Sequence, residues 1–243
     1  MKKTTFVLVL AAAVSVAVFQ SCSGNADAKG NMKEPSEDES SIAAKENEKP
    51  EEGSASAKSA SDARTLSFKN LQDAFKGETT ASAKYAEYSK KAEAEGYHEI
   101  AMLFKAASVS EKIHATNHKA VLEEGGQTTP EIKPEFTVKS TKENLQDAVK
   151  GESYEIATMY PEFITNANTA GNQLALVSLN YAYKTEQKHK VFYEKALAAL
   201  ENKTVKSLAL VYYVCPTCGN TYETSPPKRC GISMTSSEKF IKI

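Results

Sequence analysis

The chain has 243 residues, of which 41% are hydrophobic and 25% charged, and its formal net charge is −1. This composition is typical of a soluble globular protein with enough apolar residues to form a sizeable core. The near-neutral charge argues against a nucleic-acid-binding surface, so we expect no nucleic-acid partner.

Residues 1–21 have the features of a bacterial export signal. Two lysines precede an apolar run at 6–19, which is too short for a permanent transmembrane helix. Ser21 then precedes Cys22, as in the cleavage box of bacterial lipoproteins, where the cysteine becomes the lipidated first residue. We therefore predict an exported lipoprotein, facing the periplasm or the cell surface, that meets a membrane only through a lipid anchor. A plain secretory signal is the alternative.

Residues 22–64 are predicted to be a disordered tether. They include no aromatic and almost no branched apolar residue, and they are rich in Ser, Ala, Glu, Lys, Gly and Asp. Such a segment buries too little apolar surface to offset the entropy lost on ordering.

Residues 65–203 are predicted to form a four-helix bundle. Apolar residues recur there with the helical period of 3.6 in four stretches, which cover roughly 66–92, 98–124, 141–163 and 171–200. Pro130 and Pro134 mark an extended crossover, from which we expect the third helix to run parallel to the first. Ser140 and Glu143 fit a capping box at the start of the third helix.

The strongest signal is a duplicated pattern of carboxylates. NLQDAFKGET at 70–79 recurs as NLQDAVKGES at 144–153, and each copy is followed by a Glu-x-x-His on a later helix. Unpaired carboxylates on the apolar faces of these helices would repel one another and be costly to desolvate. The pattern therefore predicts a carboxylate-bridged dimetal centre inside the bundle. Its predicted ligands are Glu78, Glu111, His114, Glu152, Glu155, Glu186 and His189.

This oxygen and nitrogen donor set suits iron or manganese, with zinc as an alternative. A single Glu-x-x-His on a helix is usually a solvent-exposed pair, but two in register on apolar faces favour metal binding. The two halves are not equivalent, because Glu155 of the second copy corresponds to Ala81 of the first.

Residues 208–243 form a separate β-rich segment, too small to have much core of its own. Its cysteines Cys215, Cys218 and Cys230 match a pair of Cys-x-x-Cys knuckles, in which Ser233 replaces the fourth cysteine. Three interpretations stay open. Ser233 binds iron through oxygen, or another group fills the fourth position, or the segment holds zinc or a Cys215–Cys218 disulfide and passes no electrons.

Over residues 66–243 the chain resembles the rubrerythrins. The resemblance rests on GET followed by Tyr85, SEKIH at 110–114, GESYE followed by MYPEF at 159–163, TEQKH at 185–189, and CPTCG. It implies a ferritin-like bundle with two irons, followed by a rubredoxin-like domain with one. It also implies a peroxidase that protects against oxidative stress by reducing hydrogen peroxide to water. An external electron donor, which the sequence does not identify, would act through the rubredoxin-like domain.

The resemblance also implies roles for single residues. The seven glutamates and histidines would bind the two irons, and Glu155 and His114 would exchange as ligands on reduction. Tyr85 and Tyr160 match tyrosines that hydrogen-bond ligand carboxylates. Glu155, or a water held by Tyr160, would supply protons. The family assembly implied is a homodimer or larger, in which the C-terminal segment of one subunit approaches the metal centre of another.

Two other functions fit parts of the sequence. A ferritin-like protein that oxidises and sequesters iron would need the bundle but not the cysteine knuckle. A surface-anchored binding protein could keep the bundle for stability alone, but leucine or alanine would then serve better than buried glutamate. The sequence as a whole favours the peroxidase.

Overall fold

The structure is a computed structural model that describes residues 52–243, with side chains from residue 59 onward. The predicted export signal, Cys22 and most of the predicted tether lie outside the described residues. Within the described part, none of the helices is both long enough and apolar enough to cross a membrane.

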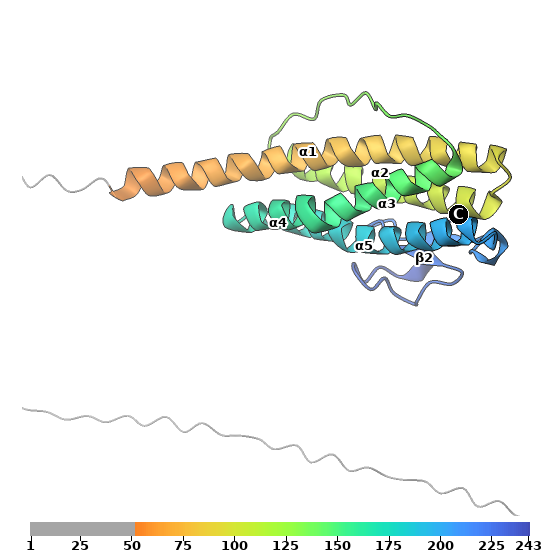
Figure 1. The fold of residues 1–243 in the computed structure, drawn as a ribbon. Coiled ribbons are helices and arrows are strands. Elements are labelled where there is room, and N and C mark those ends of the chain that lie inside the picture. Colours follow the sequence, from red (N-terminus) through yellow and green to blue (C-terminus); the bar gives the residue numbers. More distant parts are fainter. Residues whose placement is uncertain (1–51) are drawn as a thin grey trace, which may run out of the picture. The chain divides into compact units, whose positions relative to one another are not determined.

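The helices form an elongated bundle of four arms (Figure 1). They are α1 (Glu52–Ala94), α2 (His98–Glu124), α3 (Thr141–Tyr154), α4 (Tyr160–Thr169) and α5 (Gln173–Glu201), and a π-helical turn at Glu155–Met159 joins α3 to α4. The joined α3 and α4 make one arm. Ser140 caps α3 through the predicted capping box with Glu143.

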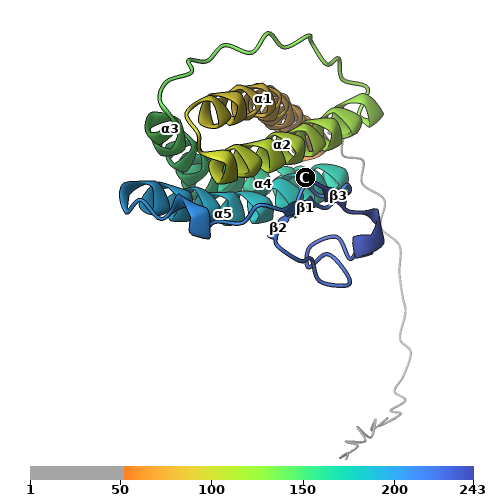
Figure 2. The ribbon, with the colours of Figure 1, turned by 90° about the vertical axis from the view of Figure 1, so that its right-hand side faces the viewer.

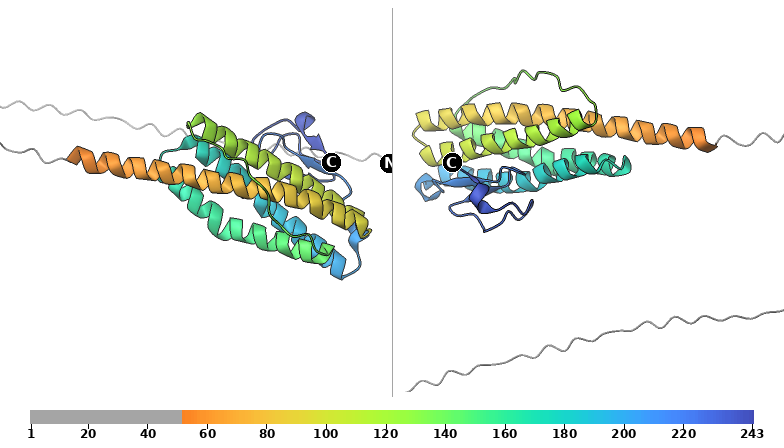
Figure 3. Two further views of the ribbon diagram at one scale, coloured as in Figure 1. Left: turned by 90° about the horizontal axis from the view of Figure 1, so that it is seen from above. Right: turned by 180° about the vertical axis from the view of Figure 1, so that it is seen from behind.

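The crossover at 125–140 runs along the outside of the bundle from one end to the other (Figures 1 and 3). It delivers the start of α3 to the end of α1, where the Thr141 backbone N–H donates to Glu95 at 2.9 Å. The predicted parallel arrangement of the first and third helices is therefore wrong, and they are antiparallel. The reason is that an extended crossover of this length spans the whole bundle.

Two other expectations about the helices need correction. The predicted tether ended at residue 64, but α1 begins at Glu52. Residues 59–64 are mostly exposed, so they contribute nothing to the core. They are helical nonetheless, because nucleation is the costly step of helix formation and an Ala-rich segment extends an existing helix at little cost. The third predicted helix is not one regular α-helix, since the π-helical turn interrupts it.

Buried apolar side chains form two clusters within the bundle. One includes Tyr85, Phe104 and Tyr193, and the other includes Leu71 and Tyr160. Along α1, α2 and α5, the spacing of the duplicated pattern places its glutamates and histidines between residues of these two clusters. The polar site is thus enclosed by apolar side chains at both ends.

The C-terminal segment folds into a small antiparallel sheet that packs against α2 and α5 (Figure 2). Its strands are β1 (Tyr212–Val214), β2 (Thr221–Glu223) and β3 (Ile241–Lys242), in the order β2-β1-β3. The three cysteines are buried beside the sheet. The predicted fold class, a ferritin-like helical bundle followed by a small β-rich segment, is confirmed.

Candidate metal centre

Four arms of the bundle bring six residues of the duplicated pattern together, each at most 2% exposed. Their ligand atoms form two overlapping groups, in each of which all atoms lie within 4.8 Å of one another. The first group is Glu78, Glu111, His114 and Glu186, and the second is Glu111, Glu152, Glu186 and His189. Two glutamates therefore belong to both groups, as bridging ligands of a dimetal centre do.

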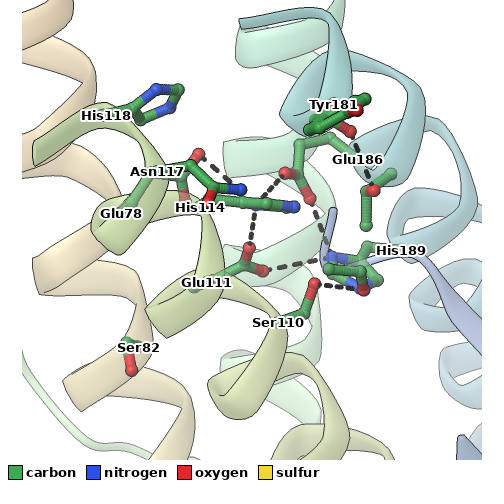
Figure 4. Close-up of polar contacts among 12 residues, drawn as sticks. Glu78, Ser82, Ser110, Glu111, His114, Asn117, His118, Tyr181, Glu186 and His189 are labelled. Atoms are coloured by element: carbon green, nitrogen blue, oxygen red, sulfur yellow. Dashed lines mark hydrogen bonds and ion pairs between the residues drawn. The ribbon is translucent and has the colours of Figure 1, made fainter. Parts of the chain in front are cut away.

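The two shared glutamates lie between the two imidazoles (Figure 4). Glu111 presents one oxygen 2.9 Å from His114 Nδ1 and the other 3.1 Å from His189 Nδ1. Glu186 likewise presents one oxygen 2.8 Å from His114 Nδ1 and the other 2.7 Å from His189 Nδ1. Each carboxylate thus offers one oxygen to each half of the site.

The hydrogen-bond partner of the outer nitrogen, Nε2, determines which nitrogen of each imidazole carries the proton. His114 Nε2 lies 3.1 Å from the carbonyl oxygen of Cys218, which can only accept, so Nε2 carries the proton. His189 Nε2 lies 3.0 Å from the Thr221 hydroxyl, which itself donates to the Gly219 carbonyl. In the neutral ring, both Nδ1 atoms then present lone pairs to the centre of the site.

The inward-facing atoms have close neighbours but no hydrogen bonds. Both oxygens of Glu111 and of Glu186, one oxygen of Glu152, and Nδ1 of both histidines are buried without a hydrogen-bond partner. Buried polar atoms are rarely left so. Their lone pairs converge on common points, and the donors are oxygen and nitrogen, so the residues present fit two divalent metal ions.

Two tyrosines hold the outer glutamates in a reciprocal arrangement. Tyr85, seven residues after Glu78, donates to Glu152 at 2.8 Å. Tyr160, eight residues after Glu152, donates a hydrogen bond to Glu78. The extra residue in the second interval is taken up by the π-helical turn, which has one more residue in its hydrogen-bonded loop than an α-helix.

Glu155 lies in that π-helical turn and is half-buried. Among the described residues it belongs to neither four-residue group. Burial and the nearby carboxylates, Glu78 first among them, raise the pKa of Glu155 well above its usual range, so it lies within their electrostatic reach. Its predicted ligand role stays a prediction.

The charges of the site depend strongly on one another. Burial raises the pKa of Glu78 to about 7, although His114 acts in the opposite sense. Burial also opposes ionisation of Glu186, but His114 and His189 outweigh it and lower that pKa to about 2. For His189, burial is outweighed by Glu111 and Glu186, which raise its pKa to about 10. Without metal, imidazolium rings supply the positive charge that the carboxylates need.

The C-terminal knuckle gathers a second donor set. Cys215, Cys218 and Cys230 are free thiols whose sulfur atoms form one group within 4.8 Å. Ser233 Oγ lies 3.3 Å from Cys215 Sγ, and it exchanges a hydrogen bond of 2.8 Å with Thr235. The serine oxygen therefore borders the thiol cluster. The disulfide considered between Cys215 and Cys218 is not formed.

The knuckle docks directly on the bundle site of the same chain. Ser110 donates to the Gly219 carbonyl at 2.7 Å, and Thr185 donates to the Cys218 carbonyl at 3.3 Å. A Cβ at Gly219 would lie 2.3 Å from His114 Nε2, so only glycine permits this approach. The expectation from the family was an approach to another subunit. An exchange of C-terminal segments between two copies would use the same contacts.

Sequence reasoning missed Ser110 and Thr185, although the repeat carries a signal for them. Thr185 lies 75 residues after Ser110, and each directly precedes the glutamate of a Glu-x-x-His. Both hydroxyls donate to main-chain carbonyls of the knuckle. The repeated unit is therefore Ser/Thr-Glu-x-x-His, whose hydroxyl contacts the knuckle while Glu and His face the site.

Comparisons with known proteins agree with this geometry. A family model described as Rubrerythrin matches residues 69–197. Rubrerythrin-2 of Clostridium acetobutylicum is 34% identical over 75% of this chain and 98% of its own length. Nigerythrin of Nitratidesulfovibrio vulgaris is 32% identical over 71% of this chain and 84% of its own length.

Solved structures give the same result. A structure of fully reduced nigerythrin, described as all ferrous, matches with a TM-score of 0.66 and 30% identity, covering 73% of this chain and 86% of that one. A bacterioferritin of Desulfovibrio desulfuricans matches with a TM-score of 0.56 at 18% identity, covering 69% of this chain and 98% of that one, and supports the fold alone.

The pKa shifts predict opposite pH dependences for metal-free and metal-loaded protein. Without metal, folded Glu78 binds its proton more tightly than the unfolded chain does, so the free energy of unfolding falls as pH rises from 4.5 to about 7. His189 has the same sign between 6.5 and about 10. Metal binding releases these protons, so the loaded protein gains stability over the same range.

Thermal unfolding at a series of pH values, with chelator and with Fe(II) under anaerobic conditions, measures both slopes. Glu186 does not disturb the comparison, because its lowered pKa acts only below 4.5. Equal slopes with and without metal would contradict the assignment of these residues as ligands.

Proposed function

The chain belongs to the rubrerythrin family, and we propose that it is a non-haem diiron peroxidase that reduces hydrogen peroxide to water. Electrons from an external donor would pass through the C-terminal knuckle. The observation that carries the proposal is the hydrogen bond from His114 to the Cys218 carbonyl. It joins a residue of the bundle site to a cysteine of the knuckle, and iron storage needs no such connection.

In this proposal, each four-residue group would hold one iron, and Glu111 and Glu186, which belong to both groups, would serve both irons. When bound, two Fe(II) ions supply the two electrons that cleavage of one O–O bond requires. His114 and His189 offer Nδ1, because their Nε2 protons are committed to Cys218 and Thr221.

The remaining residues hold and supply protons. Reduction of hydrogen peroxide to two waters consumes two protons along with two electrons. The hydroxyl proton of Tyr160 lies in the hydrogen bond that Tyr160 donates to Glu78. The hydroxyl proton of Tyr85 lies in the hydrogen bond that Tyr85 donates to Glu152. Burial and the nearby carboxylates raise the pKa of Glu155 well above its usual range, so it holds a proton more tightly than a free carboxyl and would be a further proton source.

The apolar surroundings exclude water from the site. Phe104 and Tyr193 lie at one end and Tyr160 at the other, all fully buried. A dry site strengthens the interactions between the carboxylates and any bound cation.

The knuckle would deliver electrons to the site. Cys218 would hold the knuckle metal through its sulfur, while its carbonyl oxygen accepts the His114 proton. One residue therefore touches both sites. The fourth ligand of the knuckle iron would be the Ser233 oxygen, which is a harder donor than thiolate and favours Fe(III). Zinc in the knuckle would leave the docking intact but stop the relay.

For the whole protein, we propose export and anchoring in a membrane through a lipid on Cys22, with the folded part held on the residues that follow. We also propose a homodimer or larger assembly. The hydrogen bonds between knuckle and bundle are compatible with exchange of C-terminal segments between copies.

The peroxidase is tested by stopped-flow spectroscopy of anaerobically reduced protein with two irons in the bundle. We expect one equivalent of hydrogen peroxide per iron pair to oxidise the two bundle irons completely and much faster than dioxygen does. The knuckle iron should then be oxidised by transfer of its electron to the oxidised pair. Slow reaction with peroxide and continued uptake of added Fe(II) would favour a ferritin-like ferroxidase that sequesters iron. Absence of reaction at both centres would leave a structural bundle.

A Gly219→Ala substitution tests the electron path. The added Cβ would displace the knuckle from His114, so we expect electron transfer from the reduced knuckle to slow by roughly 10–100-fold. The reaction of the already reduced bundle centre with peroxide should slow much less, because no candidate metal ligand is removed. The matched control is Gly96→Ala, because Gly96 has a similar φ of +81° but no atom within 4 Å of the added Cβ. Equal electron transfer in both variants would contradict the path.

Replacement of Ser233 tests the fourth knuckle ligand. We expect Ser233→Cys to give the absorption and EPR signals of a ferric four-thiolate site and to raise the reduction potential, because thiolate stabilises Fe(III) less than the serine oxygen. Ser233→Ala should weaken iron binding. Unchanged spectra and potential in both variants would show that Ser233 is not a ligand.

A further inference from the structure

A buried histidine outside the two metal-binding groups has no role in the function proposed above. His118 lies one helical turn beyond His114 on α2 and is fully buried (Figure 4). Its Nδ1 lies 2.8 Å from the Ser178 hydroxyl on α5, and its Nε2 lies 3.5 Å from the Tyr160 hydroxyl on α4. The imidazole therefore connects two arms of the bundle behind Glu78.

The direction of each hydrogen bond follows from the carboxylate end. Tyr160 donates its proton to Glu78, so the phenol oxygen can only accept from His118. His118 must then carry its proton on Nε2, which leaves a lone pair on Nδ1 to accept from Ser178. Every donor in the chain from Ser178 through His118 and Tyr160 points toward Glu78.

The ring is held in the neutral form that this chain of hydrogen bonds requires. Burial and the neighbouring His114 lower the pKa of His118 to about 3, although Glu186 acts in the opposite sense. The polar groups that face the ring are hydroxyls, from Ser178 on α5 and Tyr160 on α4. A neutral imidazole both donates and accepts, whereas a charged one could not accept from Ser178.

The internal repeat places a different pair of side chains at the other end of the site. Positions 75 residues apart correspond in α2 and α5, so His118 corresponds to Tyr193 and Ser178 to Leu103. Leu103 is buried and has no polar group. Burial of an imidazole and a serine hydroxyl, where the other copy has a tyrosine and a leucine, is costly unless both are hydrogen-bonded.

We propose that His118, supported by Ser178, is a positioning residue that fixes the Tyr160 hydroxyl on Glu78. In the Glu78 half of the site, His118 then donates to Tyr160, the tyrosine that donates to the glutamate. In the other half, no imidazole within the described residues donates to Tyr85, the tyrosine that donates to Glu152. Glu78 is held in place for metal binding, and the Tyr160 proton is kept at Glu78. The catalytic consequence rests on the proposed peroxidase function, but the positioning itself does not.

NMR of the whole protein labelled with ¹⁵N-histidine and loaded with Zn(II), which is diamagnetic, tests the positioning without turnover. Of the four histidines in the chain, we expect His118 to be neutral, with a slowly exchanging proton on Nε2. Ser178→Ala should shift its Nδ1 resonance, and Tyr160→Phe its Nε2–H resonance. A proton on Nδ1, or on both nitrogens, would overturn the proposal whether or not the protein is a peroxidase.

Substitution of His118 extends the test to the metal site. His118→Leu fills the space but removes the donor, so we expect Zn(II) affinity at the Glu78 group to fall by roughly 10–100-fold. His118→Gln keeps an N–H donor and should recover most of the affinity. If the two variants bind Zn(II) equally well, His118 only fills space. Should His118→Leu fail to fold, the NMR of the unsubstituted protein still decides.

Discussion

The structure depends on one electrostatic constraint, which is the burial of several carboxylates in the middle of a helical bundle. Glu111 and Glu186 are almost fully buried, and their oxygens make no hydrogen bonds. Such groups are tolerated only next to positive charge. In the metal-free chain the two imidazoles provide it, and their raised pKa values are the consequence. Two divalent cations would provide it more completely, and would release the imidazole protons.

The same constraint explains why the surroundings of the site are so closely specified. Four of the six buried candidate ligands have an outer contact that fixes their orientation: the histidines donate to Cys218 and Thr221, and the outer glutamates accept from Tyr85 and Tyr160. Two of these contacts belong to the knuckle. The C-terminal segment is thus part of the site's support as well as its proposed electron supply, and its small core is completed by α2 and α5.

Much of the site was predictable because its residues repeat at a fixed spacing on helical faces. Period and spacing fix which side chains share a face, so six of the predicted ligand residues lie together in the structure, while their metal binding stays a prediction. The π-helical turn was not predictable, because the extra residue that brings Tyr160 to Glu78 has no local signature in the sequence. The start of α1 was missed because composition alone cannot tell a tether from a helix that extends from a bundle.

Contacts between distant segments escaped prediction for a different reason. The docking of Gly219 on His114 joins residues more than a hundred positions apart, and no periodicity encodes such a contact. Ser110 and Thr185 carried a repeat signal, but its meaning depends on where the knuckle lies. The predicted direction of α3 was wrong because the path of a long crossover is set by the bundle it follows rather than by its own residues.

The central claim is that this cluster is a dimetal site whose imidazoles bind through Nδ1 while their Nε2 protons face the knuckle. Diffraction from crystals of the iron-loaded protein in its reduced state, measured at the iron absorption edge, tests it most directly. We predict two anomalous peaks inside the bundle, one beside Nδ1 of His114 and one beside Nδ1 of His189, with Glu111 and Glu186 between them. A single peak, or coordination through Nε2 with the knuckle displaced, would contradict the account.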